Sequence, residues 1–380
     1  DYIAACGEAG LPWNPDFNGA TQEGAGTYQM TIKGRRRNSA ARAFLHPAMK
    51  RPNLRVITKA QVLRVVFEGK RAVGVEYLHE GQRKILRAKA EVILSAGAIG
   101  SPQLLQVSGV GEGALLSRLG IPVVRENANV GAHYTDHHGL NYTWRMKVPT
   151  YNGILRPWWG KAFVGLQYFL TGGGPLSKSI NHGGGFFKTR PEHDRPNMQL
   201  YMQAFSTLLP RAGERPLLTP DPFPGLSLGL SNCRPTSRGH VKITSPDALV
   251  HPEIVGNAYS TPEDVEEMLL AVKFLRKIAA QPSFARWVEA ELRPGPEVQT
   301  DDELIADFRA RSGTVYHQSC TCRMGPDAAS SVIDSRLRVH GVDGLRVIDA
   351  ASFPNLIAGN TNAPAMMVGW KGAEMVLADA

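Results

Sequence analysis

One short polar segment of the sequence, Val315 to Gly325, gathers side chains that could move a proton or hold a metal ion. His317 carries an imidazole, which titrates near neutral pH and can therefore act as a general base. A single histidine is also common in an ordinary core or on a surface, so this segment alone leaves both roles open. Cys320 and Cys322 have no second cysteine pair at a zinc-site spacing, so no metal site is predicted.

Two further segments carry residue types that suit an organic cofactor. Gly97 to Gly111 (GAIGSPQLLQVSGVG) contains glycine-rich turns, which let a backbone approach a ligand closely. Asp349 to Ala351 is followed by Gly359 to Pro364 (GNTNAP), where an acidic residue, a small-residue loop and a helix start would suit an electron-rich ligand. Ordinary connections between strands and helices explain each segment equally well when it is taken alone.

The elements around these segments indicate how they are positioned. Glu91 to Leu94 is apolar without alternation, as in a strand buried on both faces, and leads into a small-residue turn and a helix that Ser101 could cap. Leu345 to Ile348 has the same character, and a helix is expected from about Pro364 to Leu377. An antiparallel meander is predicted before them, with strands at Leu54–Thr58, Val62–Glu68, Ala72–His79 and Lys84–Ala88.

The middle of the chain has a different pattern, with strands of a second sheet and two helices. Apolar residues at helical spacing predict a helix from Thr261 to about Ala280, and Asp301 to Arg311 predicts a shorter one. We therefore predict a mixed α/β (α+β) fold in which a second domain, 137–312, is inserted into a discontinuous first domain, 1–136 and 313–380. The strands predicted for the second sheet are Leu140–Lys147, Asn197–Phe205, Leu226–Asn232 and His240–Thr244.

Composition excludes several classes of protein. The 380 residues contain four cysteines, too few for a disulfide scaffold, and have no apolar run long enough to cross a membrane. The net charge of +9 comes from scattered cations, and the one tight run, Arg35 to Arg37, has no interleaved aromatic residues, so no nucleic-acid partner is predicted. The chain opens at Asp1 without a signal-peptide pattern and is expected to begin inside a domain of a cytoplasmic protein.

Taken together, the three segments resemble the glucose–methanol–choline (GMC) flavoprotein oxidoreductases, with choline dehydrogenase-like members the most similar. Gly97 to Gly111 is similar to the second signature of that family. Tyr316-His317, followed by Thr321 to Gly325, resembles the segment that holds the family's active-site histidine. Leu345 to Pro354 and Gly359 to Pro364 resemble its C-terminal flavin segment.

This resemblance covers nearly the whole chain, most closely at 54–131 and 313–378, and implies an FAD cofactor. It implies an FAD-binding domain (a Rossmann-like sheet plus the β-meander) and an inserted substrate-binding domain built on an antiparallel sheet with helices. The activity it implies is oxidation of a primary alcohol to the aldehyde by hydride transfer to flavin N5. Electrons would then pass to oxygen, or to a quinone or artificial acceptor, so both an oxidase and a dehydrogenase are compatible with the sequence.

The same resemblance implies roles for individual residues. His317 matches the general base, and Asn360, 43 positions later, matches its partner. Val62 matches the residue whose backbone meets the adenine. The positions implied to bind FAD are Val62, Ala96, Gly97, Asp349, Ala350, Asn360, Thr361 and Asn362.

Two features depart from the family pattern. The strand–GxGxxG–helix unit is absent, so we expect the chain to be the C-terminal portion of a longer protein, with the missing N-terminal segment as its partner. When the chain is aligned on Gly184 to Phe186, His182 stands where choline-handling members carry a glutamate, which favours a neutral alcohol over choline. A lyase-like enzyme that cleaves hydroxynitriles with FAD bound, and a non-catalytic fragment or subunit of a two-chain flavoenzyme, remain as alternatives.

Overall fold

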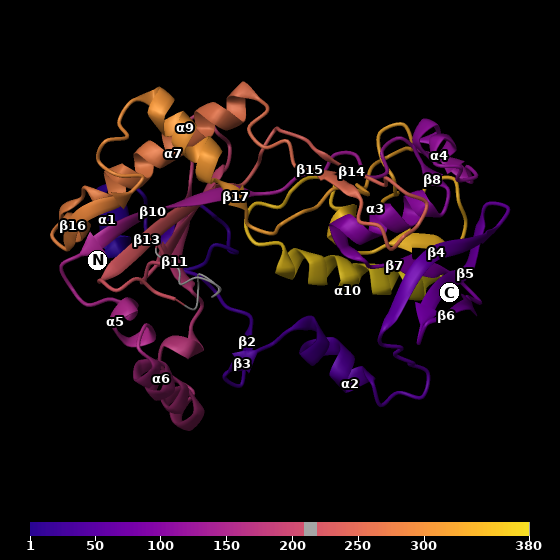
Figure 1. The fold of residues 1–380 in the computed structure, drawn as a ribbon, viewed down its shortest axis with the longest axis horizontal. Helices are drawn as coiled ribbons and strands as arrows, with labels where there is room; N and C mark the ends of the chain where they lie inside the picture. Colours follow the sequence, from indigo (N-terminus) through magenta and orange to yellow (C-terminus); the bar gives the residue numbers. More distant parts are fainter. Residues whose placement is uncertain (209–218, 380) are drawn as a thin grey trace. The chain divides into compact units, whose positions relative to one another are not determined.

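The computed structural model describes residues 1–208 and 219–379 and divides into two compact units (Figure 1). Both units draw on segments that lie far apart in the chain. Unit 1 comprises Asp1–Pro47, His138–Cys233 and Pro262–Val315, and unit 2 comprises Ala48–His137, Arg234–Thr261 and Tyr316–Ala380.

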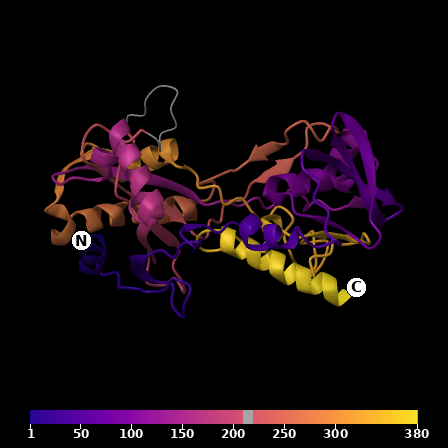
Figure 2. The same cartoon turned by 90° about the horizontal axis from the view of Figure 1, so that it is seen from below.

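Unit 2 contains the predicted meander and a parallel strand pair. The meander has the strand order β4-β5-β6, and β18 pairs in parallel with β7, so that Leu345 lies opposite Val92. Helix α3 follows β7, and Figures 1 and 2 show α10 as one long uninterrupted helix in yellow. The elements of unit 2 are β4 (Ala60–Glu68), β5 (Arg71–His79), β6 (Gln82–Arg87), β7 (Val92–Leu94), α3 (Gly97–Val107), β8 (Val110–Gly111), α4 (Gly113–Arg118), β9 (Arg125–Glu126), β14 (His240–Lys242), β15 (Glu253–Val255), β18 (Leu345–Val347), η4 (Ala350–Ser352) and α10 (Asn362–Asp379).

The core of unit 2 forms where the short parallel strands meet helix α3 and the meander. Val92 and Leu94 of β7 are buried together with Leu105 of α3 and Val347 of β18. Val65 of β4 joins the same cluster. Because burying one such side chain stabilises a fold by about 1.5–3 kcal/mol, this cluster fixes the ends of β7 and β18 at which the predicted cofactor segments begin.

Unit 1 is built on an antiparallel sheet covered by helices. The strands follow the order β1-β11-β12-β13-β10-β16, with β17 also pairing with β10. Helix α7 packs its buried face, which includes Met268 and Leu275, against β13. The elements of unit 1 are α1 (Tyr2–Glu8), β1 (Gly24–Thr27), β2 (Ile32–Lys33), β3 (Arg36–Arg37), η1 (Ala41–Leu45), α2 (His46–Ala48), β10 (His138–Met146), α5 (Tyr151–Leu155), α6 (Trp158–Thr171), η2 (Pro175–Ser177), β11 (Asn181–Phe187), β12 (Met198–Gln203), β13 (Gly225–Asn232), α7 (Pro262–Ala279), α8 (Pro282–Ala285), β16 (Val288–Arg293), α9 (Asp301–Arg311) and β17 (Gly313–Thr314).

Several elements differ from the prediction. Residues 54–58 form no strand; Lys59, with a φ of 55°, turns the chain before β4 begins. The strand at His240 belongs to unit 2, where it pairs with β15 rather than with the larger sheet. Helix α3 begins at Gly97, so Ser101 lies inside the helix and is not its cap.

The division into units also departs from the predicted domain boundaries. Residues 1–47 group with the segment that starts at His138, because β1 pairs with β11. Residues 234–261 group with unit 2, where Gln106 of α3 donates to the carbonyl of Val241 at 2.9 Å and accepts from the amide of Ile243 at the same distance.

Candidate functional site

The predicted catalytic pair is adjacent in unit 2. His317 Nε2 lies 3.3 Å from Nδ2 of Asn360, although the two residues are 43 positions apart in the chain. On the other side of the ring, His317 Nδ1 lies 2.9 Å from Nδ1 of a second histidine, His137, which is fully buried. The two imidazole rings stand nearly perpendicular, with an interplanar angle of 89°.

These contacts indicate which nitrogen of His317 carries a lone pair. The side-chain nitrogen of Asn360 can donate hydrogen bonds but cannot accept them, so the Nε2 atom of His317 that it faces must be the acceptor. Neutral His317 then carries its hydrogen on Nδ1 and donates it to Nδ1 of His137. The arrangement leaves His317 Nε2 as the basic atom, on the same side as the exposed Asn360.

The backbone around His317 is held independently of its side chain. The amide of His317 donates to Oδ1 of Asp136 at 2.9 Å, and Ser319 exchanges backbone hydrogen bonds with Thr135. Burial lowers the pKa of His317 below its ordinary value, and the Asp136 carboxylate opposes that shift. The imidazole is therefore kept neutral, the state that a base needs.

Asp349 organises the segments predicted to bind the cofactor. Its Oδ2 accepts from the amide of Gly97 at 2.8 Å and from the hydroxyl of Ser101 at 2.6 Å, and its Oδ1 accepts from the amide of Ala351 at 2.7 Å. Burial raises the pKa of Asp349, and these three donors partly offset that shift. One carboxylate thus joins the turn before α3 to the turn after β18.

The segment of the predicted catalytic residue His317 is hydrogen-bonded to this turn. The amide of Cys320 donates to the carbonyl of Ala350 at 3.2 Å, and the amide of Cys322 donates to that of Ala351 at 2.9 Å. The hydroxyl of Thr321 donates to the carbonyl of Ala98 at 2.7 Å. The segment that carries His317 therefore runs beside the residues predicted to meet the cofactor.

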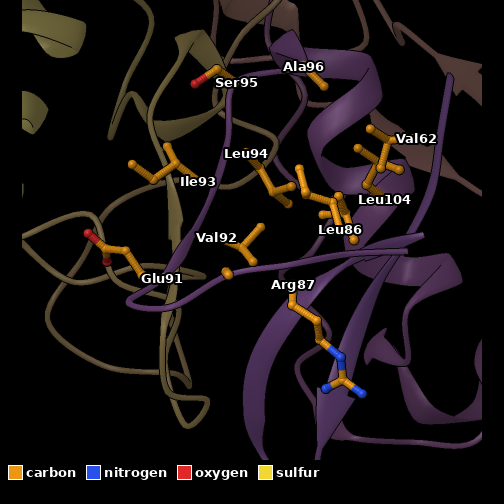
Figure 3. A pocket seen from close by; sticks show the side chains of 13 residues that line it. Val62, Leu86, Arg87, Glu91, Val92, Ile93, Leu94, Ser95, Ala96 and Leu104 are labelled. Carbon is orange, nitrogen blue, oxygen red and sulfur yellow. The ribbon is translucent and has the colours of Figure 1, made fainter. Parts of the chain in front are cut away.

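A cavity of about 430 Å³ lies between the meander and the end of β7. Two residues predicted to bind the cofactor, Val62 and Ala96, belong to its lining. Figure 3 shows the apolar side chains of Val62, Leu86 and Leu94 gathered together, while Arg87 directs its charged end away from them. Beside it, Gly97 has a φ of +79° and nothing within 4 Å of the place where a Cβ would lie, so the backbone there is open to a ligand.

Helix α10 starts within the last predicted segment. It begins at Asn362, directly after Thr361 and Asn360, and runs to Asp379. The first turn of a helix has unpaired backbone N–H groups and a partial positive charge, which suit an electron-rich ring. Asn360, Thr361 and Asn362 therefore lie together at this helix start.

Neither His137 nor the role of Ser101 was predicted from the sequence. His137 belongs to a polar run, Asp136 to His138, that leads into β10 and matches no catalytic motif. Its contact with His317 spans 180 positions, and neither residue type nor local spacing indicates such a pairing.

Two family models decide the family of this chain. The N-terminal GMC oxidoreductase model matches residues 1–138, and the C-terminal model matches residues 235–369. The chain is also 40% identical over 379 residues to an alcohol dehydrogenase [acceptor] of Pseudomonas putida, covering 99% of this chain and 67% of that protein. The chain belongs to the GMC oxidoreductase family.

Further comparisons agree with this assignment. The chain is 39% identical over 370 residues to an oxygen-dependent choline dehydrogenase of Paraburkholderia xenovorans, covering 97% of this chain and 65% of that protein. An FAD-dependent oxidoreductase from Chaetomium thermophilum shares its fold, with a TM-score of 0.89 at 23% identity over 100% of this chain and 71% of that one. The chain spans about two thirds of the length of the curated relatives it matches.

The resemblance, the mixed α/β fold class and FAD as the cofactor, all predicted from the sequence, are thereby confirmed. A search of the described residues for a bilayer-crossing helix, by length and apolar character, finds no candidate.

Proposed function

We propose that this GMC oxidoreductase oxidises a primary alcohol to the aldehyde, with His317 as the general base. The observation that carries this proposal is the placement of His317 Nε2 3.3 Å from Asn360, with Nδ1 held by His137 at 2.9 Å. Removal of a hydroxyl proton requires a base whose basic nitrogen is free of hydrogen and a neighbouring group that positions the hydroxyl. His317, with its tautomer fixed by His137, and the carboxamide of Asn360 would supply these.

The residues of the chain then act as follows. The carboxamide of Asn360 holds the hydroxyl group of the alcohol, because an amide offers both a donor and an acceptor. His317 Nε2 accepts the hydroxyl proton as the carbon–oxygen double bond forms. The imidazolium that results keeps its Nδ1 hydrogen on His137, which stays neutral and accepts it. When bound, FAD supplies the acceptor, flavin N5, for the hydride that leaves the alcohol carbon.

The residues present fit FAD. The apolar cavity beside Val62 and Ala96 suits the flat face of an adenine, and the open backbone at Gly97 leaves room for a chain of phosphates or hydroxyls. The start of α10 at Asn362 suits the electron-rich end of a flavin. Val62, Ala96, Gly97, Asp349, Ala350, Asn360, Thr361 and Asn362 would hold it.

The proposed substrate is a neutral alcohol. His182, at the position expected to face a substrate cation in choline-handling members, is half-buried in β11, and burial lowers its pKa. A neutral imidazole at that position provides no carboxylate for a quaternary ammonium. Because one relative is named an alcohol dehydrogenase and another a choline dehydrogenase, an experiment has to compare a neutral alcohol with choline as the substrate.

Anaerobic mixing of the FAD-loaded protein with a panel of primary alcohols and choline tests the proposal. We expect the yellow flavin absorbance to bleach with a neutral primary alcohol, and the aldehyde to appear in equal amount. A flavin that remains yellow while hydroxynitriles are cleaved would identify a lyase instead. A purified chain that stays colourless with added FAD would favour a non-catalytic subunit. Oxygen uptake compared with reduction of an artificial acceptor then separates an oxidase from a dehydrogenase.

A further inference from the structure

Helix α6 of unit 1 presents an apolar face to solvent. Of its 14 residues, Trp158 to Thr171, only Gly160 and Val164 are buried. Trp158 is 80% exposed and Phe169 is 84% exposed. Soluble proteins rarely expose large apolar side chains in such a continuous group. The exposed apolar residues of this face are Trp158, Trp159, Phe163, Leu166, Phe169 and Leu170.

The spacing of these residues makes them one surface. Trp159, Phe163, Leu166 and Leu170 follow at intervals of four, three and four residues, which places them along one side of a helix. Figure 1 shows α6 at the periphery of unit 1, on the side opposite α7 and α9. The helix therefore does not cover the sheet core of its unit with this face.

A basic hairpin lies against the same helix. The hydroxyl of Tyr168 donates to the carbonyl of Arg35, in the turn between β2 and β3, and the side chain of Arg35 lies at Gly172. A second hydrogen bond joins the segment after α6 to the residues before β2: the amide of Ser179 donates to the sulfur of Met30 at 3.0 Å. The exposed cations of the hairpin are Lys33, Arg35, Arg36 and Arg37.

Acidic residues are absent from both segments that build this surface. The sequence has no Asp or Glu from residue 24 to 67, nor from 137 to 191. Lys161 within α6 and Lys178 after it add further exposed cations. The surface is thus aromatic and aliphatic along its ridge and positive beside it.

We propose that this surface, formed by α6 and the β2–β3 hairpin, binds the face of a bilayer that contains anionic lipids. Tryptophan, phenylalanine and leucine on one helix face, with lysine and arginine beside them, is the pattern of a helix that lies in the lipid headgroup region. The long cationic side chains can reach headgroup phosphates while the rings enter the acyl boundary. The cations beside the apolar ridge, with no acidic residue in either segment, complement negatively charged headgroups better than a protein face of mixed charge. The proposal does not depend on the reaction, because all its residues belong to unit 1.

Flotation with lipid vesicles tests this proposal on the full chain loaded with FAD. One set of vesicles contains phosphatidylcholine alone, and the other also contains phosphatidylglycerol. We expect the protein to float with the anionic vesicles, to float little with the neutral ones, and to lose binding as salt rises. The triple variant R35Q/R36Q/R37Q should bind anionic vesicles about 100-fold more weakly.

The apolar face is tested by a double variant, W158S/F169S, which should weaken binding by at least about tenfold. Its matched control is Trp13→Ser, because Trp13 is 69% exposed in the same unit but lies outside α6. The control should bind like the wild type. Since the replaced side chains are exposed, unchanged circular dichroism and melting temperature confirm that the variants fold.

Tryptophan fluorescence gives a second measurement. Anionic vesicles should shift the emission of the wild type to shorter wavelength, and W158F/W159F should lose that shift while W13F keeps it. Equal binding to neutral and anionic vesicles, or no binding to either, would overturn the proposal. A double variant that turns a dimer into a monomer without changing lipid binding would assign the face to a second copy of the chain instead.

Discussion

Replacement of His137 by leucine tests whether the second histidine fixes the tautomer of the base. His137 is fully buried, and its Nδ1 atom lies 2.9 Å from that of His317. Leucine offers no acceptor, so the Nδ1–H of protonated His317 would lose its partner. A hydrogen bond to a charged group contributes about 1.5–3 kcal/mol, which corresponds to a fall in kcat/KM of roughly 10- to 100-fold.

The conservative variant His137→Asn separates positioning from simple packing, because the amide oxygen of asparagine can accept the same hydrogen. We expect it to recover most of the lost rate. ¹⁵N spectra of histidine-labelled protein without flavin give a readout other than activity. His317 should carry its hydrogen on Nδ1 in the wild type and the asparagine variant, and shift toward Nε2 in the leucine variant.

The control for this experiment is His340→Leu, which removes another half-buried histidine of unit 2, one that lies 3.0 Å from the hydroxyl of Ser331. It should leave both kcat and the His317 resonances unchanged. Normal kcat and an unchanged Nδ1 signal in His137→Leu would refute the tautomer argument. An equal loss of rate in the leucine and asparagine variants would assign His137 a packing role only.

Three further predictions concern the base, the carboxylate network and the cavity. Burial lowers the pKa of His317, so the decrease of kcat/KM on the acid side of the pH profile should lie below pH 6.5. The variant His317→Gln should lose this pH dependence, and its kcat should be about 10²- to 10⁴-fold lower. Activity is lost as pH falls through this pKa, since the protonated ring cannot accept a proton. Ser101→Ala removes a donor to the half-buried Asp349 carboxylate and should lower the free energy of unfolding in urea by about 1.5–3 kcal/mol. Its control, Ser95→Ala, loses a hydrogen bond to a neutral carbonyl and should lower that free energy by about 1 kcal/mol. Val62→Trp should fill part of the 430 Å³ cavity and weaken FAD binding at least about tenfold, as measured by a fluorescence titration. The control is Gln61→Trp, which replaces an exposed residue of the same strand and should leave FAD binding unchanged.

Local sequence signals predicted the elements that carry strong periodicity or caps. Asp301 to Arg311 forms a helix with the predicted bounds, because Thr300 and Glu303 close a capping box and acidic residues occupy its first turn. The meander strands were also predicted from local sequence, because glycine turns separate their β-branched runs. Residues 54–58 have the same composition but form no strand, because a strand also needs a partner and the turn at Lys59 removes them from β5.

Long-range contacts limited the prediction of the site. The pairing of His317 with Asn360 was proposed from motif resemblance, and the geometry agrees with it at 3.3 Å. His137 was not found, because its partner lies 180 positions away and its own segment has no cofactor signature. Ser101 was taken for a helix cap because its type suits one. Its real partner, Asp349, lies in the turn after β18, 248 positions later.

The backbone around His317, the proposed base, positions this residue more than its own side chain does. The carboxylate of Asp136 accepts a hydrogen bond from the backbone amide of His317. The amide of Cys320 donates to the carbonyl of Ala350, and the hydroxyl of Thr321 donates to the carbonyl of Ala98, so these hydrogen bonds hold the loop without the imidazole. Removing the ring in His317→Gln should therefore leave the loop and the FAD site in place. Unchanged FAD affinity in that variant, together with lost kcat, would separate a chemical role from a structural one. A variant that loses FAD as well would show that the ring itself supports the cofactor segments, and the assignment of His317 as a base would then need independent evidence from the pH profile of the wild type.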